Sequence, residues 1–212
     1  MFGELLLVLL LVPGGTAVLG LIVPGRYANV HRGMSLVGSF MTLGVSVYLF
    51  AMYDYGDGGL QFDLQYPWIE NVGIFKENGI SLHLAIDGIS APLVLLNGLV
   101  AFAGTLISWK IAHRPKDFFI LFNVLVAGVF GVYVAQDLFF WFFFYELAVL
   151  PMYLLIGVWG SSTDFRTFFR SKDYAAMKLF IFLVAGSVLV WVAILAVYVG
   201  AADAGFSTFS LK

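Results

Sequence analysis

Six long apolar runs dominate this chain and limit the environments in which it can fold. They cover residues 2–23, 34–53, 89–109, 118–135, 138–160 and 174–200. About 20 apolar residues in a helix span the hydrocarbon core of a bilayer, so each run is long enough to cross it. Only 11% of the residues are charged, against about a quarter in soluble domains. We therefore predict an all-α integral membrane protein with about six transmembrane helices, folded as one membrane domain over residues 1–212.

The positive charges predict the orientation of these helices. Lys and Arg gather in the segments 26–32, 110–116 and 166–172, whereas the alternate segments carry mostly Asp and Glu. Positively charged loops stay on the cytoplasmic side. The first residues contain Glu4 and no Lys or Arg, unlike the positively charged start of a cleaved signal peptide, so we expect a retained helix there. The predicted location is a bacterial inner (plasma) membrane, crossed several times, with both termini in the periplasm.

The one long connection, residues 54–88, is predicted to lie on the outer face. Within it, residues 80–86 place apolar side chains at every second position, which is typical of a short strand. Asp87 and Gly88 then form a turn, with Asp87 or Ser90 as the N-cap of the third helix. The alternative is a disordered loop. A much shorter connection, Gln136 and Asp137, predicts a tight hairpin between the fourth and fifth helices.

The composition leaves little room for metal, redox or nucleotide chemistry. The chain has no cysteine, and therefore no disulfide, thiolate-held iron–sulfur cluster or cysteine-ligated zinc. His31, His83 and His113 lack the spacing of metal ligands, and we expect all three at the surface. No phosphate-binding glycine loop and no nucleophile beside a base is present. We predict no cofactor or metal on this chain and no nucleic-acid partner.

Two ionisable residues inside the apolar runs are the candidate functional residues. Glu146 follows an aromatic run and lies near the middle of the fifth helix, where a charge costs at least about 2.5–3.5 kcal/mol. Pro151 removes one helical hydrogen bond beside it and could distort the helix. We predict a proton relay at Glu146; the alternative is a protonated Glu bonded to a neighbouring helix. Lys178 is either a relay or counter-ion, or a lysine that extends to the membrane surface.

Small and polar residues inside the runs predict helix packing. Small residues recur four positions apart, which favours close helix contact. The pairs are Ser35 with Ser39, Gly38 with Thr42, Ala101 with Thr105, and Ala127 with Gly131. Four polar residues inside the runs are lesser candidates for a functional role: Asn97, Asn123, Thr105 and Ser187. They could form hydrogen bonds between helices or hold water, but a role in helix packing is the simpler interpretation.

The segment 145–160, with its Glu, Pro-Met-Tyr and terminal Trp-Gly, resembles the fifth helix of a known family. The family is the antiporter-like chain M of bacterial NADH-quinone oxidoreductase, or respiratory complex I, whose mitochondrial counterpart is subunit 4. Residues 175–182 and 87–90 are similar to its sixth helix and to its entry into the third.

This resemblance implies the N-terminal part of an antiporter-like inverted-repeat fold. It implies that Glu146 is half of an intramembrane Glu–Lys pair, whose Lys lies on a seventh helix beyond this sequence. We therefore expect that the chain as given cannot form a complete proton path. The expected partners are other membrane subunits of complex I, neighbouring antiporter-like subunits, lipid and protons, with flavin and iron–sulfur clusters in partner subunits.

The expected function is a non-redox membrane subunit of NADH:quinone oxidoreductase that takes part in proton translocation coupled to quinone reduction. One alternative is a subunit of an Mrp-type cation/proton antiporter or of a related membrane-bound hydrogenase. A further alternative is a truncated structural membrane module.

Overall fold

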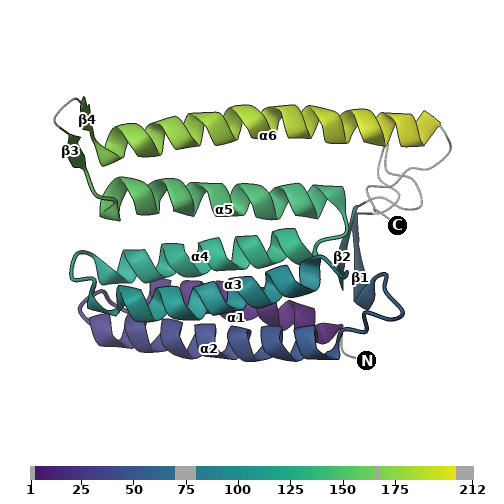
Figure 1. Ribbon diagram of the computed structural model, residues 1–212, viewed down its shortest axis with the longest axis horizontal. Helices are drawn as coiled ribbons and strands as arrows, with labels where there is room; N and C mark the ends of the chain where they lie inside the picture. The colour runs from purple at the N-terminus through teal and green to yellow at the C-terminus, as the bar shows by residue number, and fades with distance from the viewer. Residues whose placement is uncertain (1–2, 70–79, 166–167, 204–212) are drawn as a thin grey trace.

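The computed structural model describes residues 3–69, 80–165 and 168–203 and contains six long helices that lie side by side (Figure 1). All six are long and apolar enough to cross a membrane, which confirms the predicted helical membrane fold. The helices are α1 (Glu4–Ile22), α2 (Ala28–Met52), α3 (Ser90–Ile107), α4 (Pro115–Val134), α5 (Leu138–Trp159) and α6 (Lys172–Asp203), with a 3₁₀ turn η1 (Ser108–Lys110) after α3.

Three helices begin earlier than the apolar runs indicate, α6 by only two residues, at Lys172. Helix α2 begins at Ala28 rather than at residue 34. Its first two turns carry the polar residues Asn29, His31 and Arg32, so they do not belong to the apolar run from which the helix was predicted. Helix α4 begins at Pro115 rather than at residue 118. Proline is well suited to the first turn, where its missing N–H has no helical partner in any case.

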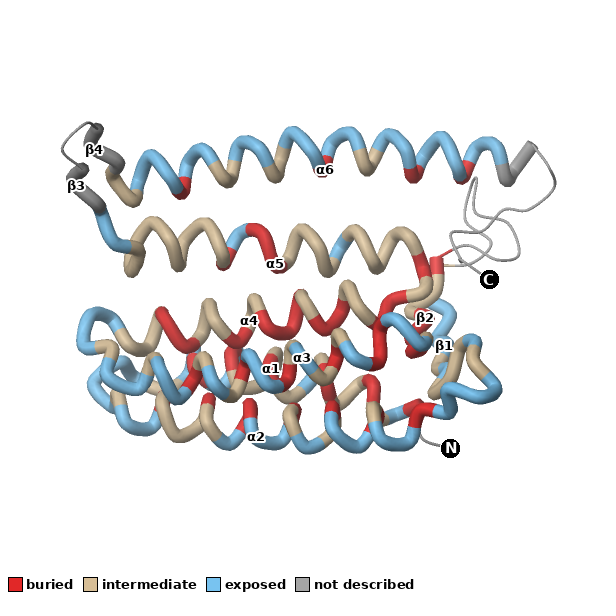
Figure 2. Tube along the Cα trace, viewed as in Figure 1, coloured by how far each residue is buried: buried red, intermediate tan, exposed pale blue. Residues whose placement is uncertain are grey.

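The helices form a four-helix group with two more helices layered on it. Helix α4 packs against both α1 and α5, while α2 packs against α3 and α1. Helix α6 packs mainly against α5 and lies farthest from α1 and α2 (Figure 1). Buried residues concentrate in the four-helix group, whereas most of α6 is exposed (Figure 2).

Small residues bring the helices of the group together. All eight residues of the predicted four-residue pairs are buried, as expected for helix packing positions. The closest approach joins α4 to α5: a Cβ added at Gly128 would lie 3.0 Å from the Cβ of Ala148, and one at Gly131 would overlap the ring of Phe144. The contact therefore requires a residue without a Cβ at Gly131, and at Gly128 a methyl group would need its neighbours to shift by a few tenths of an ångström.

Two short hairpins lie at opposite ends of the bundle (Figure 1). Strands β1 (Gln61–Ile69) and β2 (Ile80–Ile86) pair antiparallel, and Leu84 of β2 also bridges to Ala135 in the turn between α4 and α5. This confirms the predicted strand at 80–86; its partner strand was not predicted. At the other end, β3 (Thr163–Phe165) pairs with β4 (Phe168–Arg170). We call the end with β1 and β2 the hairpin end and the opposite end the basic end.

At the basic end, cationic side chains bind the last carbonyls of helices that finish there. Lys116 Nζ donates to Leu21 O at 2.9 Å and to Val23 O at 2.8 Å, at the end of α1. Lys172 Nζ donates to Val158 O, in the last turn of α5, at 2.8 Å. These carbonyls have no helical partner and carry the negative end of the helix dipole, so a cation there is favourable.

Two histidines lie inside the protein, and the prediction that they are surface residues was wrong. His31 is 2% exposed and faces α1, where a Cβ added at Gly20 would lie 3.7 Å from its Nδ1; glycine leaves room for the ring. His83 is 1% exposed because the turn between α4 and α5 covers its strand. His113 is exposed, as predicted.

Candidate functional site

Glu146 lies on the side of α5 that faces α6. Phe144 and Ala148 of α5 contact Gly131 and Gly128 of α4, and so mark the side of α5 that faces α4. Successive residues of an α-helix are about 100° apart around its axis, so a residue two positions from each of these lies on the opposite side. The carboxyl of Glu146 therefore points away from the four-helix group.

Contacts between α5 and α6 fix how the two antiparallel helices are aligned. Towards the basic end, a Cβ at Gly157 would lie 3.8 Å from that of Ala176. One helical turn further, the rings of Tyr153 and Phe180 are 5.0 Å apart between centroids. On the hairpin side of Glu146, Phe142 stacks on Trp191 at 4.9 Å. Glu146 thus lies between two aromatic contacts, in the layer between α5 and α6.

The layer between α5 and α6 leaves one oxygen of Glu146 without a partner among the described residues. Its side chain is half-buried, and Oε1 is buried with no hydrogen bond to any of the described residues. A buried polar atom without a partner is unfavourable by about 1–3 kcal/mol. Pro151 is buried in the same helix and cannot donate to the carbonyl of Leu147, although α5 remains continuous. The site therefore holds a carboxyl that can accept a proton or a polar neighbour.

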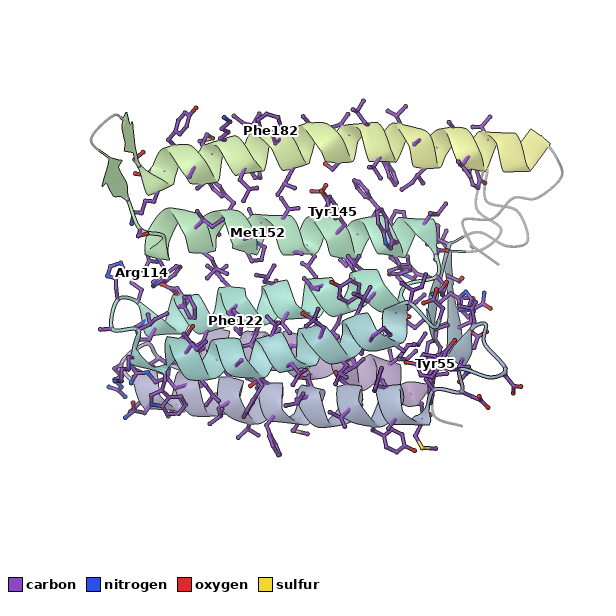
Figure 3. The ribbon with its side chains drawn as sticks, in the orientation of Figure 1. Tyr55, Arg114, Phe122, Tyr145, Met152 and Phe182 are labelled. Carbon is purple, nitrogen blue, oxygen red and sulfur yellow. The ribbon has the colours of Figure 1, made fainter. Side chains whose placement is uncertain are left out.

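The structure does not bring Lys178 to Glu146. Lys178 is two residues from Ala176, which faces α5, so it lies on the opposite side of α6 and is exposed. Its Nζ is 6.0 Å from the ring centroid of Tyr174 in the same helix. Phe182, one turn further along, is 69% exposed and also lies on the side of α6 away from α5 (Figure 3). A role for Lys178 stays a prediction.

A second polar group, which the sequence did not single out, lies at the start of α5. Asp137 is fully buried, and its Oδ1 accepts from Phe139 N at 2.9 Å and from Phe140 N at 3.4 Å, which caps the helix. Its Oδ2 accepts from Ser81 N of β2 at 3.3 Å. Burial raises the pKa of this carboxyl, while the three backbone hydrogen bonds and nearby His83 act in the opposite direction. Asp137 thus ties the hairpin to the helix that carries Glu146.

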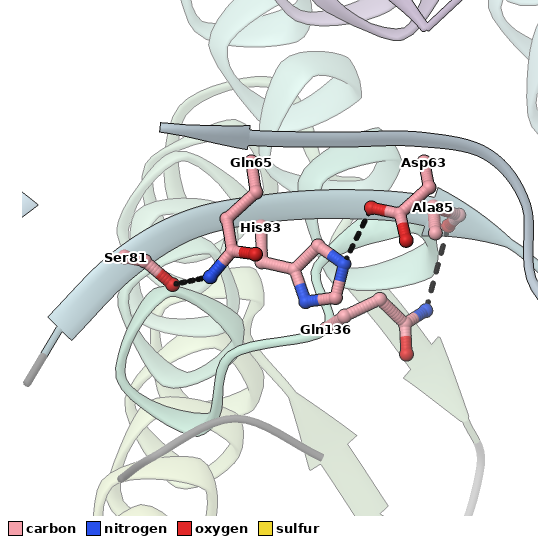
Figure 4. A network of polar contacts seen from close by, with 6 residues as sticks. All are labelled: Asp63, Gln65, Ser81, His83, Ala85 and Gln136. Carbon is pink, nitrogen blue, oxygen red and sulfur yellow. Dashed lines mark hydrogen bonds and ion pairs between the residues drawn. The ribbon is translucent and has the colours of Figure 1, made fainter. Parts of the chain in front are cut away.

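The hairpin is held over this turn by a small polar network (Figure 4). His83 Nε2 is 2.8 Å from Asp63 Oδ1, which joins β2 to β1. Gln136 N donates to His83 O at 2.8 Å, and its side-chain amide donates to Ala85 O at 3.4 Å. The tight turn predicted at 136–137 is therefore also the docking point of the hairpin.

The lesser polar candidates mostly bond to nearby carbonyls. Asn123 joins two helices, since its Nδ2 donates to Ser35 Oγ of α2 at 2.8 Å. Asn97 of α3 donates to Val126 O of α4 at 3.5 Å. Thr105 and Ser187 donate to carbonyls one turn back in their own helices. No group of three His, Asp or Glu that could hold a metal occurs in the described part of the chain.

Comparison with known proteins supports a family for this arrangement. A model of the family described as NADH:quinone oxidoreductase/Mrp antiporter, transmembrane, matches residues 135–212. The NAD(P)H-quinone oxidoreductase chain 4 1 of Synechococcus sp. (strain JA-3-3Ab) is 34% identical over 177 residues, which are 83% of this chain and 31% of that protein. The NADH-quinone oxidoreductase subunit M of Pseudomonas aeruginosa is 38% identical over 191 residues, 85% of this chain and 36% of that one.

A solved structure shows the same fold. A chain of respiratory complex I from Thermus thermophilus with bound NADH superposes with a TM-score of 0.72 at 23% identity, over 99% of this chain and 38% of that one. The six-helix arrangement, together with the match to the family model, indicates an antiporter-like membrane fold. The chain is similar to the N-terminal part of subunit M, also called chain 4, of NADH:quinone oxidoreductase, and its residues 135–212 match the family model that includes these antiporter-like subunits. It spans about a third of the length of these curated relatives.

Proposed function

We propose that this chain is part of a membrane subunit of NADH:quinone oxidoreductase that takes part in proton translocation coupled to quinone reduction. The observation that carries the proposal is the position of Glu146: a carboxyl midway along a transmembrane helix, with a buried oxygen that has no partner among the described residues. Ionisable groups inside the membrane are unfavourable and most often serve ion or proton pathways.

In this proposal Glu146 takes up and releases a proton as its surroundings change. Desolvation favours the neutral carboxyl and a nearby cation favours the charged one, so movement of a cation in a neighbouring element would change the proton affinity. Lys178 is proposed as a relay or counter-ion to a group outside α1 to α5. The chain itself carries out no redox step; flavin and iron–sulfur clusters are assigned to partner subunits, and the other membrane subunits are the proposed partners.

The test is proton uptake into vesicles that contain the whole complex, driven by the quinone reaction. Glu146→Gln preserves shape and most hydrogen bonding but cannot titrate, so pumping should fall steeply while assembly is retained, and Glu146→Asp should keep part of it. Glu4→Gln, at an exposed carboxyl in the first turn of α1, is the matched control and should pump normally. Near-normal pumping by Glu146→Gln would refute the relay.

A second candidate is a subunit of an Mrp-type cation/proton antiporter, because the matching family is described by both activities. The two differ in the reaction that drives the proton. NADH-driven quinone reduction by the purified complex supports the first candidate. Sodium-dependent growth that requires this gene, without quinone reduction, supports the second.

A further inference from the structure

Ser187, a buried polar residue of α6, lies opposite Glu146. The pairs Gly157 with Ala176, Tyr153 with Phe180, and Phe142 with Trp191 define one antiparallel register. Glu146 is four residues after Phe142 in α5. Because the two helices are antiparallel, the residue of α6 at the same level is four residues before Trp191, which is Ser187. Side chains four residues apart lie on the same face of a helix, so both residues face the layer between α5 and α6.

Burial supports this position. Ser187 is 4% exposed on a helix that is otherwise largely exposed, and the buried residues Ala176 and Ile194 lie on the same face. An exposed helix can bury a residue only where another element covers it. The main cover of α6 is α5, and Ile80 of β2 joins it only near Ile194 and Tyr198, at least seven residues beyond Ser187. The serine hydroxyl therefore lies in the same enclosed layer as the buried Oε1 of Glu146.

The present hydrogen bond of Ser187 leaves it free to accept another. Its Oγ donates to Val184 O at 3.0 Å in its own helix, so the single hydroxyl hydrogen is used and the lone pairs of the oxygen are available. A neutral Glu146 can donate its proton to that oxygen. A charged Glu146 needs a donor instead, which Ser187 supplies if its side chain rotates away from Val184 O.

We propose that Ser187 is a positioning residue for Glu146, accepting a hydrogen bond from the protonated carboxyl and donating one to the carboxylate. This rests on the proposed role of Glu146 as the proton site. The two side chains are not hydrogen-bonded in the structure, so a rotation of one or both is part of the proposal. A hydroxyl that serves both states gives the carboxyl one hydrogen-bond partner between the two aromatic contacts, whether it holds its proton or has lost it.

The test compares two serine variants in the whole complex, reconstituted in vesicles. Ser187→Ala removes the hydroxyl. Ser39→Ala is the matched control, since Ser39 is 3% exposed and donates to Leu36 O one turn back at 3.1 Å, but lies in α2, away from α5. Pumping should fall roughly ten- to hundredfold in Ser187→Ala, the range that loss of one hydrogen bond to a charged group corresponds to, and stay normal in Ser39→Ala. Ser187→Thr, which keeps a hydroxyl, should restore most of it.

Infrared difference spectroscopy supplies the readout that a packing role would not change. The C=O band of the protonated carboxyl, assigned by its loss in Glu146→Gln, should move to higher wavenumber in Ser187→Ala only. An unchanged band with normal pumping, or equal losses in both alanine variants, would overturn the proposal while leaving Glu146 as the proton site. If Glu146→Gln itself pumps normally, the proposed function fails instead. If Ser187→Ala does not assemble, Ser187→Cys fills the site with a weak donor and carries the same expectations.

Discussion

Asp137 shows how one residue can serve a helix and a hairpin at once. Each of its two oxygens has a different partner: Oδ1 accepts hydrogen bonds at the N-terminus of α5, and Oδ2 accepts one from the backbone N–H of Ser81 in β2. Asp137→Asn keeps an acceptor for the cap but places an amide donor against the N–H of Ser81. Asp137→Ala loses both interactions, and loss of the cap alone is worth about 1 kcal/mol. We expect the alanine variant to unfold at lower denaturant than the asparagine variant, measured by circular dichroism in detergent.

The buried carboxyl of Asp137 also predicts a dependence on pH. Because burial raises its pKa in the folded protein, the folded state binds this proton more tightly than the unfolded chain does. The stabilising effect of that proton is present below the ordinary pKa and is lost as the pH rises through the raised one. In Asp137→Asn this decline in stability should be absent. Parallel stability curves for the two proteins, from pH 4 upward, would contradict the assignment.

At the scale of elements, the contact between α4 and α5 depends on two glycines. A Cβ at Gly131 would overlap the ring of Phe144, so Gly131→Ala should destabilise the protein by about 1–3 kcal/mol, the usual effect of overpacking. Gly44→Ala in α2 is the control, because a Cβ there meets nothing within 4 Å and alanine favours the helix. Unfolding by SDS in micelles measures both; equal stability of the two variants would show that α5 shifts without loss.

The same contact determines where the candidate site points. With α4 held against Phe144 and Ala148, Glu146 can face only α6. A variant that displaces α5, such as Gly131→Ala, should therefore also lower proton pumping in the assembled complex.

At the scale of the molecule, the acidic and basic side chains lie at the ends of the helices where the helix dipoles favour them. Helices α1, α3 and α5 begin at the hairpin end, where Asp87 Oδ1 accepts from Ser90 N at 2.6 Å and Asp137 caps α5. They finish at the basic end, where Lys116 and Lys172 bind the last carbonyls of α1 and α5. Acids at helix N-termini and cations at C-termini are both favourable.

The predicted orientation follows from the same distribution of charge, since the basic end should face the cytoplasm. In intact cells, a cysteine at Asp57, which is exposed beside the hairpin, should react with an impermeant reagent added outside. A cysteine at Lys110, exposed at the basic end, should react only after the cells are opened. The chain has no native cysteine, so the background is clean. The reverse labelling pattern would invert the topology.

The apolar runs by themselves determined the six helices, because a helix that crosses hydrocarbon must be mostly apolar over about 20 residues. Strand β2 and the glutamate in α5 could also be identified from local pattern and from one charged residue in an apolar run. The tertiary structure alone decided the burial of His31, His83 and Asp137, because burial depends on which element covers a residue. It also decided that Glu146 faces α6 while Lys178 faces away from it, since an almost uniformly apolar helix carries no pattern that distinguishes one face from another.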